Sequence, residues 1–111
     1  MAASSKANGS QLTVIDTEHT ISGAAITGDG SYQCAVDLSP LQLDDVVVIK
    51  AKIKIRSTGS LRTLYCGTFG YNPTIDGMIT IPVPGLNNSA EFTIEQTEGS
   101  PRTFNWEIIE L

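Results

Sequence analysis

The sequence predicts an all-β protein, a single antiparallel β-sandwich or jelly-roll-like barrel of about seven strands preceded by an extended N-terminal arm. Short runs alternate between apolar and polar residues from residue 11 to the C-terminus, and turns rich in Gly, Pro and Asn separate them. No segment sustains the 3.6-residue period of a helix. A chain of 111 residues with 41% apolar content suits one globular domain.

The N-terminal half begins with small polar residues, MAASSKANGS, which have no periodicity. We predict an arm at residues 1–11 and the sandwich domain at 12–111. The run QLTVIDTEH, from residue 11, alternates and predicts the first strand, and Gly-rich turn residues follow it at 28–30. The run YQCAVDL, 32–38, alternates again and predicts the next strand.

The C-terminal half of the sequence predicts a series of β-hairpins. Alternation is strongest at 46–57, which predicts a long strand, and STGS then predicts a turn. The partner strand follows from residue 61, where two glycines indicate a bend. Two prolines in MITIPVPG place that run at a sheet edge. The last two strands are predicted in SAEFTIEQT and RTFNWEIIEL, joined by a turn at 98–101.

A row of basic residues lies on one parity of the long strand: Lys50, Lys52, Lys54 and Arg56, four of the seven basic residues in the chain. One interpretation is the solvated face of a central strand, with counter-charges from neighbouring strands such as Glu91 and Glu95. The other is an electrostatic contact with an acidic partner surface.

Composition limits the classes of partner. The formal net charge of −5 disfavours nucleic acid and anionic membranes, and no apolar run approaches the ~20 residues of a membrane helix. No secretory leader is recognisable, so we expect synthesis in a cytoplasm. The two cysteines, Cys34 and Cys66, have no metal-site spacing, so we expect no cofactor. We expect both to be reduced, half-buried strand thiols, and a disulfide between them is the alternative.

Two polar clusters are candidates for chemistry. Asp16, Glu18 and His19 could support acid–base work or bind a metal, but no nucleophile motif accompanies them, so we interpret them as a strand end or loop. A second cluster could bind calcium but lacks the spacing of a calcium loop, so ordinary turn chemistry is expected. Its members are Asp37, Asp44 and Asp45.

The aromatic residues fall into two groups. Phe104 and Trp106 follow the parity expected of a core, so we predict their burial. Tyr65, Phe69 and Tyr71 share one parity around CGTFGY and form a possible ligand patch. Exposure of all three would mark a carbohydrate- or receptor-binding module of a tail or head fibre.

The spacing of DDVVVIKAKIKIRSTGSLRTLY, EQTEG, RTFNW and the C-terminal EIIEL resembles small virion structural proteins of tailed bacteriophages. This resemblance implies a non-enzymatic capsid decoration (cement) protein or another head or tail accessory protein. Its expected partners are the major capsid protein, another virion protein and further copies of the chain, with a trimer favoured. It also implies an N-terminal arm that orders on the shell, and we expect Leu12, Thr13 and Val14 to begin the anchored segment. The alternatives that remain are the fibre module described above and a hydrolase or metalloenzyme built around His19.

Overall fold

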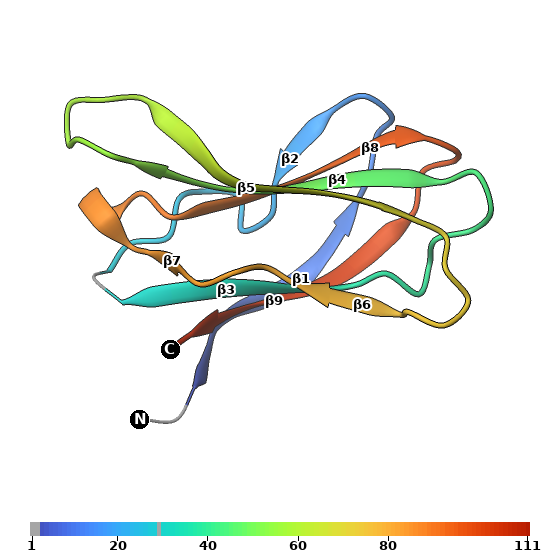
Figure 1. Cartoon of the computed structure of the whole chain (residues 1–111), viewed down its shortest axis with the longest axis horizontal. Coiled ribbons are helices and arrows are strands. Elements are labelled where there is room, and N and C mark those ends of the chain that lie inside the picture. Colours follow the sequence, from blue (N-terminus) through green and yellow to red (C-terminus); the bar gives the residue numbers. More distant parts are fainter. Residues whose placement is uncertain (1–2, 29) are drawn as a thin grey trace.

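The computed structural model describes residues 3–28 and 30–111. Within these ranges the chain forms nine strands and one short 3-10 helix, and the strands build two antiparallel sheets packed face to face (Figure 1). The all-β sandwich predicted from the sequence is confirmed. The two sheets do not close on one another, so the barrel alternative is wrong.

The first sheet has the strand order β1-β9-β3-β6, and β7 also pairs with β3. Its strands are β1 (Ser4–Leu12), β3 (Ser31–Asp37), β6 (Gly77–Ile79), β7 (Val83–Pro84) and β9 (Thr103–Glu110). The second sheet has the order β2-β8-β4-β5. Its strands are β2 (Glu18–Thr20), β4 (Val46–Lys54), β5 (Leu61–Gly70) and β8 (Glu91–Glu98), and helix η1 spans Leu86–Asn88.

The core lies between the sheets and follows from period-two alternation. Along β4, Val47, Ile49, Ala51 and Ile53 are buried and alternate with the partly exposed lysines of the basic row. The largest buried side chains in the described residues include Tyr32, Phe92 and Phe104. Burial of one such aromatic ring contributes roughly 2–3 kcal/mol, so these rings fix which face of each strand turns inward.

The predicted arm is the main correction. Ser4–Leu12 forms the edge strand β1, which pairs antiparallel with β9 from Ser4↔Glu110 to Leu12↔Thr103. Most of its side chains are exposed, so β1 shows no apolar alternation that a sequence pattern could detect. Gly9 suits the point where β1 crosses Trp106, because a Cβ there would lie 3.0 Å from the indole ring and the ring would have to shift by a few tenths of an ångström. Residues 4–11 therefore belong to the sandwich and are not a free extension, and residues 1 and 2 of the predicted arm lie outside the described residues.

The predicted strand from residue 11 is also divided. β1 ends at Leu12, and the backbone turns at Asp16, which has a φ of 62°. Only three residues, Glu18–Thr20, pair with β8. Asp tolerates this left-handed conformation better than most residues, which explains why a break is accommodated inside an alternating run.

Trp106 faces inward as predicted, although it is only half-buried at the side of the core. Its indole Nε1 is buried and has no hydrogen-bond partner among the described residues. Both cysteines are free, as expected, but neither is half-buried: Cys34 is buried in β3 and Cys66 is exposed on β5. Burial raises the pKa of the Cys34 thiol to about 12.

Candidate interaction surface

Two lysines of the basic row share one counter-charge within the molecule. Glu18, on β2, approaches Lys52 at 2.9 Å and Lys50 at 3.9 Å across the outer face of the second sheet. Its carboxylate also accepts a 2.7 Å hydrogen bond from Thr93 Oγ1. This bond, assisted by the two lysines, lowers the pKa of Glu18 despite its partial burial. The counter-charge is therefore Glu18 and not the predicted Glu91 or Glu95, and Lys50 and Lys52 follow the solvated-face interpretation.

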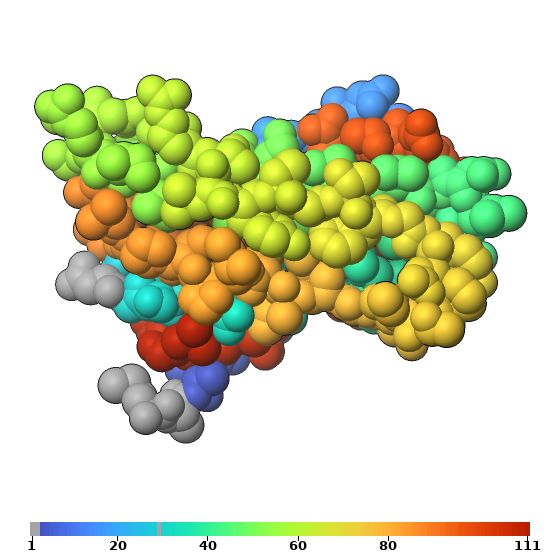
Figure 2. All heavy atoms as spheres, viewed as in Figure 1, coloured from blue at the N-terminus to red at the C-terminus, as the bar shows by residue number. Residues whose placement is uncertain are grey.

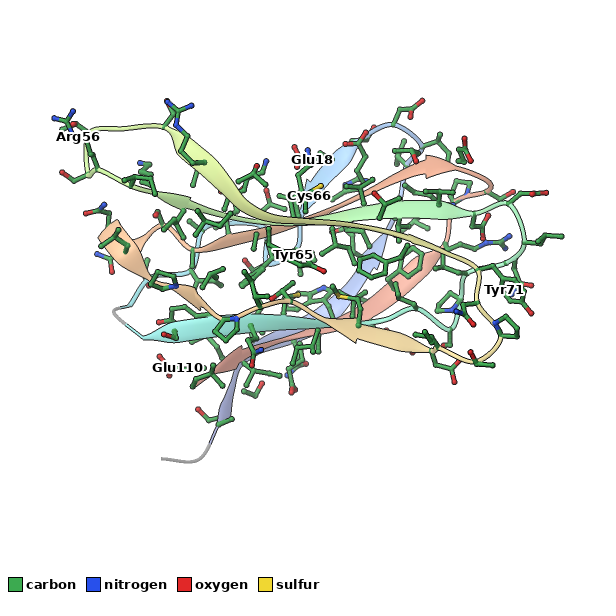
Figure 3. The ribbon with its side chains drawn as sticks, viewed as in Figure 1. Glu18, Arg56, Tyr65, Cys66, Tyr71 and Glu110 are labelled. Carbon is green, nitrogen blue, oxygen red and sulfur yellow. The ribbon has the colours of Figure 1, made fainter. Side chains whose placement is uncertain are left out.

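The other two members of the row lie at the end of the β4–β5 hairpin, which projects beyond the sandwich (Figures 1 and 3). Arg56 is exposed in the turn, and Lys54 and Arg62 lie at the adjoining ends of β4 and β5. None of the three forms a salt bridge within the described part of the chain. We call Lys54, Arg56 and Arg62 the cationic tip.

The predicted anchor at the start of the domain is only partly accessible. Leu12 and Val14 are more than half exposed, but Thr13 is buried between them. The Thr13 hydroxyl donates to the side chain of Gln96, and the Thr13 N–H donates to the Arg102 carbonyl at 2.9 Å. Thr13 therefore anchors β1 to its own fold and cannot contact a partner there.

The predicted aromatic patch is not one exposed surface. Tyr65 and Phe69 turn inward from β5 and pack against the core on either side of Gly67, where an added Cβ would meet both rings at under 3 Å. Only Tyr71 is largely exposed, beyond the end of β5. The observation required for a fibre-type binding module, joint exposure of the three rings, is contradicted.

His19 and its acidic neighbours do not converge on one site. The His19 Nε2 accepts a 3.1 Å hydrogen bond from the Val14 N–H, whereas Glu18 is directed across the sheet at Thr93 and Lys52. No group of three or more His, Cys, Asp or Glu side chains in residues 3–28 and 30–111 has an arrangement that could hold a metal ion.

Of the predicted turn acids, Asp37 shows ordinary turn chemistry, whereas Asp45 also makes contacts with a distant segment. Asp37 accepts the Ser39 N–H at 2.9 Å, which is an ordinary Asx turn. Asp45 is 2% exposed and accepts the N–H groups of Gln42 and Ser100, at 2.8 and 3.2 Å, and Arg102 Nε at 2.8 Å. Burial alone would raise the pKa of Asp45, but these hydrogen bonds and the Arg102 charge lower it overall.

The two sheets have four outer edges, and three of these edges have features that discourage pairing with another chain. β1 is polar, carries Lys6 and is interrupted by a bulge between Ser5 and Ala7. β2 has only three residues, and the β6–β7 edge consists of two short strands with prolines at 82 and 84. Short strands, bulges, lysine and proline all interrupt the row of free backbone groups that an incoming strand would use.

The fourth edge, β5, is different. It has ten residues, LRTLYCGTFG, with Arg62 as its single charge and no proline. A bulge at Leu64, between the pairs Lys52↔Thr63 and Ala51↔Tyr65, leaves Tyr65–Gly70 as a regular uncharged stretch. Figure 2 shows β5 running along the same face as the segment from β6 to β7, where Ile79 and Ile81 are about half exposed. Ile79 pairs with Ala35 and therefore points outward from the first sheet, so we call β5 alone, with its exposed Leu64, the β5 edge surface.

Charge is distributed unequally along this surface. The cationic tip lies at the Leu61 end of β5, and Figure 3 shows Arg56 and Tyr71 at opposite ends of the molecule. Near the Gly70 end, exposed acidic residues occur before β4, at the end of β8 and in the loop after β5. We call these residues, Asp44, Glu98 and Asp76, the acidic end. A small cavity of about 180 Å³, lined by Tyr71, Ile75 and Asp76 among others, adjoins them.

A larger hollow of about 610 Å³ lies on the first sheet, lined by residues of β3, β9 and the start of β6 that include Ala35, Gly77 and Trp106. It is wide open to solvent. The sequence could not indicate the β5 edge surface, because whether a strand has a free edge depends on which strands become neighbours. Its one detectable signal is a ten-residue run with a single charge.

Comparison with protein-family models, curated proteins and solved structures found no match to this chain. Within the described residues, no helix has the length and apolar character needed to cross a bilayer.

Proposed function

We propose that this chain is a non-enzymatic structural protein that associates with other protein chains through the β5 edge surface. The observation that carries the proposal is the contrast among edges: β1, β2 and β6–β7 have protective features, whereas Tyr65–Gly70 is regular, uncharged and free of proline. An extended segment that adds to such an edge gains main-chain hydrogen bonds along its length.

The setting that we propose is the virion of a tailed bacteriophage, where the chain decorates the capsid or joins another head or tail structure. Support comes from the spacing of the C-terminal hairpins, which resembles small phage virion proteins, and from the compact sandwich in which the sequence folds. A formal net charge of −5 suits a protein that stays dispersed until it reaches a specific binding surface.

Shell binding tests this proposal. The purified chain is mixed with capsids of its own phage that lack it, and the capsids are sedimented. The variant Thr68→Lys places a lysine on the exposed outer side of β5. Its charge discourages another strand from pairing with this edge, and the side chain does not enter the core. The control Ser10→Lys makes the same charge change on the polar edge strand β1.

Wild type and Ser10→Lys are expected to sediment with the capsids, and Thr68→Lys is expected to remain in the supernatant. If Thr68→Lys binds as well as wild type, the β5 edge surface is not the site of association. If wild type itself never binds, the proposed place in the virion is wrong.

A further inference from the structure

We propose that the occupant of the β5 edge surface is β5 of a second copy, paired antiparallel about a two-fold axis through Gly67. This inference rests on the proposed function, because it names the partner of the same edge; loss of shell binding in Thr68→Lys then means that only the paired form binds the shell. The two second sheets would join into one continuous sheet of eight strands, in the order β2-β8-β4-β5 followed by its symmetry mate.

The distribution of charge along β5 determines whether the two copies pair parallel or antiparallel. The cationic tip lies at one end of β5 and the acidic end at the other. Parallel pairing would place cations against cations, whereas antiparallel pairing places each tip beside the acidic end of the other copy. Complementary contacts then form twice, which is the self-complementary geometry of a two-fold interface.

The pairing register follows from the faces of the strand. Directly opposite residues of antiparallel strands lie on the same face of the sheet, so inward Tyr65 must oppose another inward residue. With Gly67 on the axis, Tyr65 lies opposite Phe69 of the other copy, and Cys66 lies opposite Thr68. Gly67 has no side chain to collide at the axis, and aromatic cross-strand pairs are favourable.

The expected interface is small. The six residues Tyr65–Gly70 extend about 20 Å, and specific dimers usually bury about 800 Å² on each partner, so pairing of this one strand, with exposed Leu64 beside it, is expected to bury less than that. We therefore expect a dissociation constant in the micromolar range, within reach of analytical ultracentrifugation. A two-fold dimer also differs from the trimer expected from the sequence, and solution mass separates the two.

A mixed-disulfide experiment tests the register. In the proposed dimer, the two Cys66 residues are diagonal neighbours about 7–8 Å apart, which is too far for a direct disulfide, whereas Cys66 and a cysteine at position 68 of the other copy are directly opposite. Wild type is mixed with Cys66→Ser/Thr68→Cys and oxidised mildly. A covalent dimer is expected in the mixture and in neither protein alone. Cys66→Ser/Ser10→Cys, with its thiol on β1, replaces the second protein as the control.

A charge-swap experiment tests the orientation. Arg62→Glu is expected to raise the dissociation constant of the dimer about tenfold, because both symmetric contacts become repulsive. Asp76→Lys is expected to do the same, and the double variant Arg62→Glu/Asp76→Lys restores dimerisation. Both side chains are exposed, so neither change removes a buried contact. Circular dichroism confirms that each variant is folded.

The outcomes separate this inference from the proposed function. A monomer or trimer at micromolar concentrations, or charge variants that dimerise as wild type does, would overturn the two-fold pairing. If Thr68→Lys still loses shell binding in that case, the β5 edge serves a different chain and the proposed function stands. If Thr68→Lys affects neither dimerisation nor shell binding, both proposals fail.

Discussion

Replacement of Asp45 by Asn is expected to destabilise the fold by about 3 kcal/mol at pH 7. The Asp45 carboxylate joins two turns that are far apart in sequence, because it accepts the N–H groups of Gln42 and Ser100 and also Arg102 Nε. An Asn side chain has only one oxygen, so at least one of these donors must face an NH₂ group. The loss of one hydrogen bond to a charged acceptor costs roughly 1.5–3 kcal/mol, and the bonds that remain lose the ionic contribution.

Urea unfolding measures this loss. With an m-value of about 1.5 kcal/mol/M, a loss of 3 kcal/mol lowers the midpoint by about 2 M. Asp44→Asn is the matched control, because it removes the same charge one position earlier from an exposed side chain and keeps a residue type that tolerates the φ of 75° there. Midpoints for the two variants within 0.3 M of each other, which at this m-value is a difference of about 0.5 kcal/mol, would refute the assigned role of Asp45.

The pH dependence gives a second measurement of the same interaction. Because the pKa of Asp45 is lower in the folded state than its ordinary value of 3.8, the carboxylate stabilises the fold above that value. This contribution is lost as the pH falls through the folded-state pKa. The difference in stability between wild type and Asp45→Asn is therefore expected to be full at pH 7 and to shrink below pH 4.

Three further predictions concern the edges and thiols. Deletion of residues 1–10 is expected to lower the melting temperature in calorimetry, because it removes most of β1 from β9; an unchanged melting curve would mean that the segment is a free arm after all. In the native state, a thiol reagent at pH 8 is expected to modify Cys66 alone, since Cys34 is buried with a pKa of about 12; two fast-reacting thiols would contradict this. Glu18→Gln is expected to cost at most about 1 kcal/mol in urea at pH 7, because the ion pairs of Glu18 are partly exposed. Since the folded-state pKa of Glu18 lies below its ordinary value of 4.5, this cost should be full at pH 7 and shrink as the pH falls below 4.5, and an equal cost at neutral and acidic pH would rule out the ionic cause.

The sequence predicted the strands whose two faces have different environments. In β4 and β8, one side of each strand meets the core and the other meets solvent, so apolar and polar residues alternate and the pattern is readable. β1 escaped detection because most of its side chains are exposed and its contribution is largely a row of backbone hydrogen bonds. The backbone N–H and C=O groups are the same for every residue type except proline. A strand held mainly by these groups therefore has no characteristic pattern of side chains.

Site residues were harder to predict because they depend on contacts between distant segments. The counter-charge of Lys52 was expected on β8, yet it is Glu18 on β2, whose position follows from the pairing of β2 with β8. Thr13 looked accessible in an alternating run, but its hydroxyl is directed at Gln96, 83 residues away in the sequence. Both contacts depend on which strands pair with one another, and a local sequence pattern does not contain that information.

The proposed dimer must form between two molecules that each carry a formal net charge of −5, and this fixes how salt should act on it. Repulsion between net charges acts over the distance between two molecules, whereas each cationic tip meets an acidic end within a few ångströms. At 0.01 M salt the Debye length is about 30 Å and both effects operate, but at 0.15 M it is about 8 Å and the long-range repulsion is largely screened. Association should therefore strengthen from 0.01 to about 0.15 M salt and weaken above it, as the local contacts become screened in turn. Sedimentation equilibrium across this range measures the effect, and a steady increase in association up to 1 M would show that apolar contacts alone, without the paired ends, hold the two copies together.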